Sequence, residues 1–179
     1  MPTTELTSDI IGRGRASTSE ALALFDALDP GDLNFMTGDW QGSGIHTGHP
    51  MDGLLETYAW HGKTFVSPDE VHPLIFEDGR GRLFAVNAAL MPMGLALRMP
   101  ALKWKIMRPV FRLGKFLLGT KKSGARLRML EHRGKFSATM IYDAQPINDV
   151  FRRLDENTVL GLMDLKGCPQ PFFFLLRRK

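Results

Sequence analysis

Alternation of hydrophobic and polar positions is clearest in the last third of the chain. In the segment KFSATMIYD, Phe136, Ala138, Met140 and Tyr142 fall on one face of an extended chain. Similar short runs precede and follow it: ARLRMLEH, DVFRRLD, TVLGLMDL and PFFFLLRR, with polar turns between them. The pattern predicts about five short antiparallel strands joined as a meander.

The first half of the chain begins with helical spacing and then changes to strand-like runs. Ser17 and Glu20 form a capping box before EALALFDAL, which predicts a helix over about 18–28, and residues 1–16 before it are predicted as a flexible arm. The runs FMTGDWQGSGI, KTFV, VHPLIF and LFAVNAAL then predict strands, with a hairpin turn at Asp78-Gly79. The segment HPMDGLLETYAW predicts a short helix between the first two runs.

Residues 91–122 have a different composition. The segment is rich in methionine and apolar residues, and Pro100 and Pro109 interrupt its helical spacing, so it predicts broken helices inserted over one end of the sheet. Between Asp78 and Glu131 there is no acidic residue, whereas the whole chain has a net charge of only +4.

The order of the elements determines the fold class. Helices and strands do not alternate, which argues against a parallel sheet, and roughly eight to ten strands favour a sheet that curls and closes. We therefore predict a mainly β protein: a single antiparallel β-barrel domain over 17–179, with an N-terminal helix and a central helical insertion. Its parts are an N-terminal half over about 22–90, the insertion over about 91–122 and a C-terminal meander over about 123–179.

Length and composition limit the number of domains, the possible cysteine chemistry and the expected cellular location. The length of 179 residues suits one domain, and the only cysteine, Cys168, rules out an intrachain disulfide and a zinc site made of several thiolates. The N-terminus lacks the apolar core of a signal peptide, and no apolar stretch is long enough to span a membrane. The expected location is the cytoplasm.

Most motifs for cofactors and metals fail on spacing. The glycines at Gly12, Gly42 and Gly114 do not complete a dinucleotide or phosphate loop, and we expect no metal site. Asp149 and other aspartates near strand ends are expected to cap turns and pair with basic neighbours. An enzymatic alternative places acid-base chemistry on five residues: His46, His49, Asp52, Asp164 and Lys166.

The acid-free basic window has three interpretations. A basic rim that attracts an anionic small ligand ranks first, and peripheral membrane contact through 93–118 ranks second. Nucleic acid is not expected as a partner, because the aromatic residues of the window are spaced for burial. The oligomeric state is left open.

Gly38, Trp40 and Gly42 form a G-x-W-x-G pentapeptide, and the run YDAQPINDVFRRLDENTVLGLMDLKG is followed by PFFFLLRR. Together these closely resemble the bacterial GXWXG family, whose members carry a C-terminal domain of unknown function. The likeness covers about residues 22–178. A looser pattern that includes Gly44 is similar to calycins: lipocalins, fatty-acid-binding proteins and nitrobindin-type haem barrels.

The calycin likeness implies a barrel in which Trp40 packs across the closed end and the glycines let the strand bend. It also makes haem an alternative cofactor. In nitrobindin-type barrels, however, the haem-ligating histidine comes from a strand near the C-terminus, and no histidine follows His132 here.

These observations lead to one functional hypothesis. The chain is expected to bind a small hydrophobic, anionic ligand, fatty-acid-like or lipid-like, inside the barrel, without catalysis and without a cofactor. The period-two pattern predicts Met140, Tyr142, Phe151, Met163 and Phe173 as lining residues. Arg108 and Arg112 are expected to receive the head group.

Overall fold

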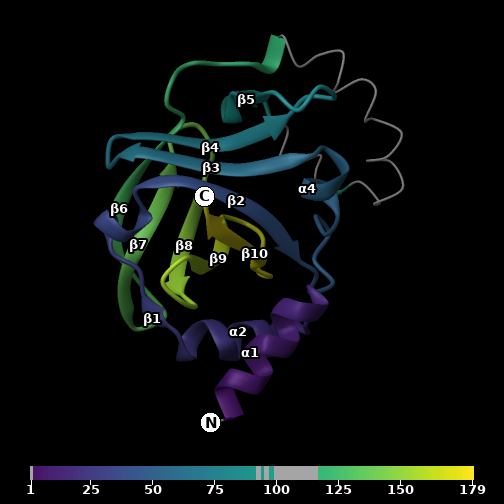
Figure 1. Cartoon of the computed structure of the whole chain (residues 1–179), viewed down its shortest axis with the longest axis vertical. Helices are drawn as coiled ribbons and strands as arrows, with labels where there is room; N and C mark the ends of the chain where they lie inside the picture. Colours follow the sequence, from purple (N-terminus) through teal and green to yellow (C-terminus); the bar gives the residue numbers. More distant parts are fainter. Residues whose placement is uncertain (1, 92–93, 95–96, 99–116) are drawn as a thin grey trace.

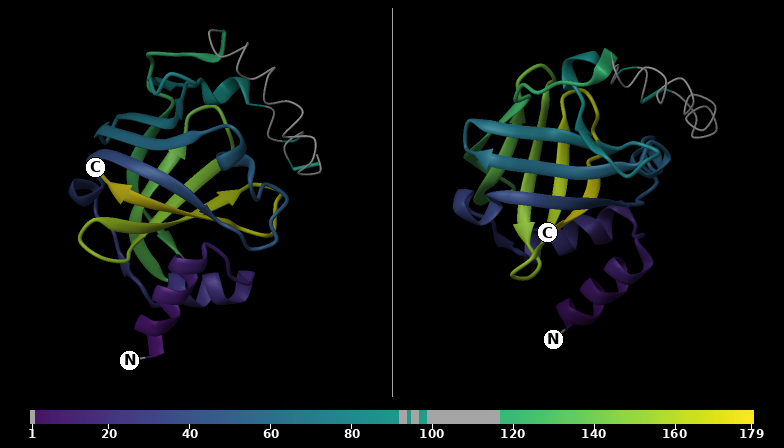
Figure 2. Two further views of the ribbon diagram at one scale, coloured as in Figure 1. Left: turned by 45° about the vertical axis from the view of Figure 1, so that its right-hand side comes forward. Right: turned by 45° about the horizontal axis from the view of Figure 1, so that its top comes forward.

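The fold is an antiparallel β-barrel with its helices on the outside (Figures 1 and 2). The structure, a computed structural model, describes residues 2–91, 94, 97–98 and 117–179. Eight long strands build the barrel: β2 (Gly38–Ile45), β3 (Trp60–Ser67), β4 (Glu70–Glu77), β6 (Ala125–His132), β7 (Lys135–Tyr142), β8 (Ile147–Arg153), β9 (Thr158–Leu165) and β10 (Phe172–Arg178).

Each of these strands pairs with the next one along the chain, and the last pairs with the first. The order is β8-β7-β6-β4-β3-β2-β10-β9, and β9 pairs again with β8, so the sheet closes into a ring. Two short strands join its margin: β1 (Asp29–Pro30) pairs with β8 and β5 (Leu83–Ala85) pairs with β4. The predicted mainly β, antiparallel barrel is confirmed, and closure leaves few unpaired edges.

The described helices are short, and the first of them was not expected. α2 (Thr18–Ala27) begins at the predicted Ser17–Glu20 capping box. α3 (Leu33–Met36), α4 (Leu54–Thr57) and η1 (Ala88–Leu90) lie in connections. Where a flexible arm was expected, residues Pro2–Arg13 form α1, and Ile10 of this helix is buried.

The barrel wall separates two hydrophobic clusters. Side chains of one parity face the lumen, among them Met140, Tyr142, Phe151 and Met163, as the sequence pattern predicted. Side chains of the other parity pack under α1 and α2. Phe173 belongs to this outer cluster, and its ring centre lies 6.4 Å from that of Phe25. The prediction that Phe173 lines the lumen is therefore wrong, and its neighbours Phe172 and Phe174 lie in the lumen cluster instead. The three consecutive phenylalanines of β10 made parity ambiguous there.

One end of the barrel is closed beside α3. The indole of Trp40 is buried, and its Nε1 donates a hydrogen bond to the carbonyl of Met36 at 2.8 Å. Phe35 packs on the same indole, and the guanidinium of Arg178 lies 4.4 Å from the indole ring centre. The side chain of Arg178 also donates to the carbonyls of Thr37 and Phe35.

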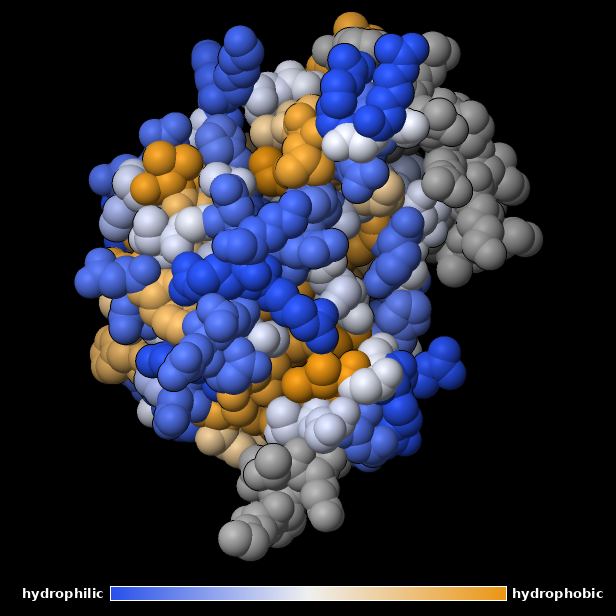
Figure 3. Space-filling model, in the orientation of Figure 1, coloured by the Kyte–Doolittle hydropathy of each residue, from blue (hydrophilic) through white to orange (hydrophobic). Residues whose placement is uncertain are grey.

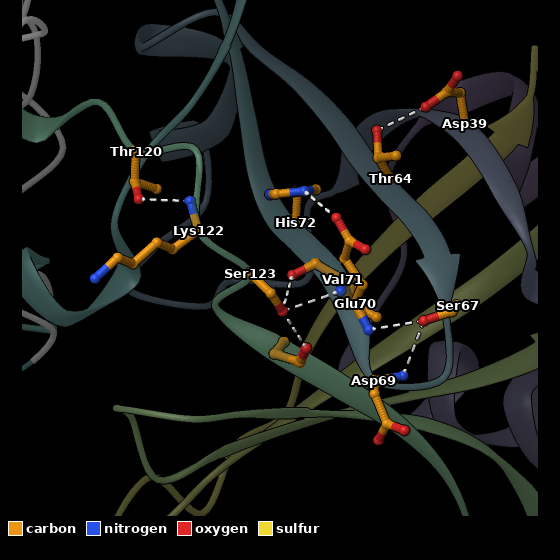
Figure 4. A network of polar contacts seen from close by, with 11 residues as sticks. Asp39, Thr64, Ser67, Asp69, Glu70, Val71, His72, Thr120, Lys122 and Ser123 are labelled. Atoms are coloured by element: carbon orange, nitrogen blue, oxygen red, sulfur yellow. Dashed lines mark hydrogen bonds and ion pairs between the residues drawn. The ribbon is translucent and has the colours of Figure 1, made fainter.

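The pairing between β4 and β6 is short, with Val71 opposite Ala125 as its one registered pair. Ser123 reinforces this seam, since its Oγ accepts from the Val71 N–H at 3.2 Å and lies 3.0 Å from the Ala125 carbonyl (Figure 4). The next backbone contact is Leu127 N–H to the Pro68 carbonyl at 2.7 Å. These bonds keep the ring closed where the insertion interrupts the meander.

The opposite end of the barrel carries the loops β2–β3, β4–β6, β7–β8 and β9–β10. Partly exposed apolar side chains pack against the lumen there, among them Leu55, Tyr58, Phe84, Met91 and Leu118. We call this the loop end. Most of the predicted insertion, including 99–116, lies outside the described residues. The outer face seen in Figure 3 is largely hydrophilic, with separate hydrophobic patches.

Candidate functional site

Two opposite charges meet inside the barrel. Lys63 Nζ lies 2.8 Å from Asp149 Oδ2, and the two side chains are only 3% and 2% exposed. Lys63 comes from β3 and Asp149 from β8. In the ring, β4, β6 and β7 separate these strands on one side and β2, β10 and β9 on the other. The ion pair therefore spans the lumen between opposite walls.

Tyr142 and a backbone carbonyl complete the surroundings of the ammonium group. Lys63 Nζ donates to the carbonyl of Pro73 at 3.2 Å and to the Tyr142 hydroxyl at 3.4 Å. Because the hydroxyl accepts this bond, its own proton is left to donate elsewhere. The rings of Trp60, Tyr142 and Phe174 have their centres 5.1 to 5.5 Å from Nζ, within the range of cation–π attraction.

Burial governs the electrostatics of this cluster. It lowers the pKa of Lys63, although the nearby Asp149 carboxylate opposes that shift. Burial likewise raises the pKa of Asp149 against the influence of Lys63, and it raises the pKa of Tyr142 well above its usual value. All three changes favour the uncharged form of each group, because a charge in an apolar interior loses its hydration.

Two buried polar atoms at the pair have no hydrogen-bond partner among the described residues. They are Asp149 Oδ1 and Trp60 Nε1. One is an acceptor and the other a donor. Since buried polar groups are nearly always satisfied, this donor and acceptor are the atoms of the lumen that a polar group of a bound molecule or a water would satisfy.

Glycines create the space for the aromatic rings around Lys63. A β-carbon on Gly42 would lie 2.0 Å from the Trp60 ring, and one on Gly161 would lie 2.4 Å from the ring of Phe174. Gly62, with φ of +148°, would bring a β-carbon within 1.8 Å of the Trp40 carbonyl. Gly42 and Gly161 therefore leave the space in which the rings of Trp60 and Phe174 lie beside the ion pair.

The five residues of the enzymatic alternative are not assembled into one cluster. His46 Nε2 is 3.8 Å from Glu56, and His49 is buried with its Nε2 3.5 Å from Cys168 Sγ. Asp52 Oδ2 instead accepts three backbone N–H groups, from residues 47, 48 and 49. Asp164 lies near the end of β9 and Lys166 directly follows this strand, and both side chains are exposed.

The remaining predicted site residues divide between the lumen and undescribed segments. Met140 and Met163 lie opposite Asp149 on its two neighbouring strands, so they flank the ion pair. Phe151 is two residues further along β8. Arg108 and Arg112 lie outside the described residues, as does most of the segment expected to contact a membrane.

Sequence reasoning missed both charged residues of the pair. Asp149 was expected at a turn, yet it lies within β8 between the lumen residues Ile147 and Phe151. Lys63 likewise shares a face of β3 with Phe65. The available signal was a charged residue with apolar residues two positions away: Lys63 with Phe65, and Asp149 with Ile147 and Phe151.

A separate cleft of about 660 Å³ lies between β5 and residues 119–121. Arg82 and Lys121 line it together with the apolar side chains of Leu83 and Phe84. Asp78 also lines the cleft and holds Arg82 in an ion pair at 2.9 Å. Within the described ranges, no group of three or more metal-binding side chains is arranged to hold an ion, and no helix is long and apolar enough to cross a membrane.

Comparisons with known protein families find a match in each half of the chain. The GXWXG protein family matches residues 23–81, and a domain of unknown function, DUF4334, matches residues 123–178. A crystal structure of a protein from Thermomonospora curvata is similar along the whole length, with 30% identity and a TM-score of 0.74. The match covers 100% of this chain and 99% of that one. No curated protein matches the chain.

Proposed function

We propose a function for this chain, which belongs to the GXWXG protein family and carries the DUF4334 region at its C-terminal end. It binds a small hydrophobic ligand inside its barrel without catalysing a reaction. The observation that carries the proposal is the buried Lys63–Asp149 pair, with Asp149 Oδ1 and Trp60 Nε1 unpaired beside it. These atoms offer a ligand one acceptor and one donor in surroundings that are otherwise apolar.

The loop end is the proposed entrance. Partly exposed apolar side chains there lead to the lumen cluster, whereas α3 and Trp40 fill the other end. An apolar tail would remain among the lumen side chains, and each methylene removed from water would contribute about 0.8 kcal/mol.

The pair also bears on the charge of the ligand. Lys63 directs its three donors to Asp149, Pro73 and Tyr142, and the Asp149 carboxylate balances its charge. An anionic head group at this position would meet a neutralised cation and a carboxylate. We therefore propose a neutral, hydrogen-bonding head group inside the barrel, in place of the anionic one expected from the basic window.

Displacement of a neutral fluorescent probe, N-phenyl-1-naphthylamine, by 1-decanol and by decanoate tests this proposal. The two competitors have the same chain length and differ in the charge of the head group. We expect 1-decanol to displace the probe more strongly, and shortening the alcohol to octanol to weaken binding about fourfold per methylene.

Two variants assign the binding to the lumen. Lys63→Met/Asp149→Leu removes both charges while keeping apolar volume, and it should reduce the preference for the alcohol over an alkane of equal length. Phe136→Ser, at a residue 64% exposed on β7, is the matched control and should bind as the wild type does. Failure of the wild-type protein to bind either the probe or the alcohols would refute the proposal.

A further inference from the structure

We infer that Lys63 attaches a carbonyl ligand covalently, by forming an imine with an aldehyde or ketone whose apolar body lies in the barrel. The inference rests on the proposed function, since the carbonyl compound must first bind in the lumen. It extends that function by naming the ligand class and the atom to which the ligand becomes linked.

The groups that imine formation requires are already within reach of one another. The amine is Lys63 Nζ, and a carboxyl group at 2.8 Å and a phenol at 3.4 Å can exchange protons with it and with the carbonyl oxygen. The Tyr142 hydroxyl retains a proton to donate to that oxygen, as does Trp60 Nε1. All of these side chains are at least nine-tenths buried, so few waters compete with the carbonyl compound.

The steps balance without an oxidant or reductant. Nζ passes one proton to Asp149 and becomes a neutral amine, whose lone pair forms the C–N bond while the carbonyl π electrons move to oxygen. That oxygen takes the proton from Asp149, and the nitrogen then gives its extra proton back to the carboxylate. Protonation of the hydroxyl by Asp149 releases water, the nitrogen lone pair forms the C=N bond, and a protonated imine remains beside the Asp149 carboxylate.

The same surroundings suit the cation before and after the reaction. A protonated imine carries one positive charge at the position of the ammonium group, so Asp149 remains its counter-ion. The rings of Trp60, Tyr142 and Phe174 face that charge from 5.1 to 5.5 Å. Asp149 Oδ1, which has no hydrogen-bond partner among the described residues, would then accept a hydrogen bond from the released water or from a second polar group of the ligand.

Lys63 differs from the other described lysines in its chemistry as well as its position. Lys121, Lys122, Lys166 and Lys179 are exposed, and Lys135 is half-buried with its Nζ donating to the carbonyls of Asp26 and Leu28. Burial lowers the pKa of Lys63 and so makes its neutral, nucleophilic form more accessible. We therefore expect Lys63 to react with a carbonyl compound at neutral pH in preference to the other described lysines.

The test combines decanal with sodium cyanoborohydride at neutral pH on the full-length protein. Cyanoborohydride reduces an imine to a stable secondary amine, and peptide mass spectrometry then locates the added decyl group. We expect Lys63 to carry the label at substoichiometric decanal, with at least tenfold lower occupancy at each surface lysine. Exposed lysines thus serve as internal controls in the same sample.

Two variants test whether Lys63 is the site of attachment. Lys63→Arg keeps a cation opposite Asp149 and cannot form a stable imine, so it should lose the label at this position while the surface lysines keep theirs. Lys63→Met/Asp149→Leu provides a second unlabelled protein in case the arginine variant does not fold. If the wild-type protein binds 1-decanol but decanal labels only surface lysines, the inference is wrong and the proposed function stands. If it binds neither compound, both fail.

Discussion

The indole ring of Trp60 occupies the space beside Gly42 that a side chain would need. A β-carbon added to Gly42 would lie 2.0 Å from the ring, far inside van der Waals contact. Gly42 is the second glycine of the G-x-W-x-G pentapeptide, and Trp60 lies on the neighbouring strand at the start of β3. The pentapeptide therefore supports two tryptophans: Trp40 within it at the α3 end, and Trp60 beside the buried ion pair.

Gly42→Ala should destabilise the protein by displacing the Trp60 ring. Overpacking a filled core typically costs about 1–3 kcal/mol, and we expect a loss of unfolding free energy in that range, measured by urea denaturation. Trp60→Leu removes the clash, so the cost of Gly42→Ala should fall in that background. Equal costs in both backgrounds would contradict the steric explanation.

Gly12→Ala is the matched control for that experiment. Gly12 lies within α1, and an added β-carbon there would meet no atom within 4 Å. Alanine is the better helix former by roughly 0.8–1.0 kcal/mol in a helix interior, so the variant should be as stable as the wild type or slightly more stable.

Much of the fold could be predicted because it follows from local patterns. The capping box at Ser17 and Glu20 marked the start of α2, and the polar turns marked the five C-terminal strands. Parity of the lumen residues was correct for Met140 and Phe151 and failed at Phe173, where every neighbouring position is also apolar. Alternation cannot assign a face when both faces are buried.

The candidate site could not be predicted, because it depends on how the ring closes. Lys63 and Asp149 are 86 positions apart in the sequence and on strands that do not pair, so no local pattern relates them. A charged residue at a strand end is usually solvated, and only the barrel brings these two together. The sequence alone does not show that Gly42 leaves space for the Trp60 ring, because that contact also depends on how the strands are arranged in the barrel.

Removing one member of the buried pair should cost far more than removing both. Lys63→Met leaves the Asp149 carboxylate unpaired in the lumen, and Asp149→Leu leaves the Lys63 ammonium group unpaired, so each should lower the unfolding free energy by about 3–5 kcal/mol. Lys63→Met/Asp149→Leu leaves no charge to desolvate and should unfold near the wild-type denaturant midpoint. Additive losses in a double-mutant cycle would show that the two side chains do not act as a pair.

Arg178→Lys should weaken the α3 end of the barrel although it keeps the charge. The guanidinium donates to the carbonyls of Thr37 and Phe35 and stacks on Trp40, and an ammonium group cannot reproduce that planar arrangement. We expect a loss of about 1–3 kcal/mol by denaturant unfolding. Arg177→Lys, at the exposed neighbouring position, is the control and should be near neutral. Equal effects at both positions would remove any special role for Arg178.

His49 should make the protein less stable as the pH falls. Burial lowers the pKa of its imidazole, although the Asp52 carboxylate nearby opposes this shift. The Met51 N–H donates to Nδ1 at 3.1 Å, and Cys168 Sγ lies against Nε2, so a second ring proton would disrupt the contact at Nδ1. Unfolded histidine, with a pKa of about 6.5, binds a proton more readily than the folded residue, so unfolding free energy is lost as the pH falls from about 6.5 through the folded pKa.

His49→Gln isolates this contribution, because the glutamine amide oxygen can still accept from Met51 and does not titrate. His61 and His132, whose pKa values burial also lowers, are present in both proteins and cancel in the comparison. Urea denaturation of both proteins at several pH values should show the wild type losing more stability than the variant on acidification. Parallel losses across that range would mean that His49 keeps the same proton affinity when the protein folds.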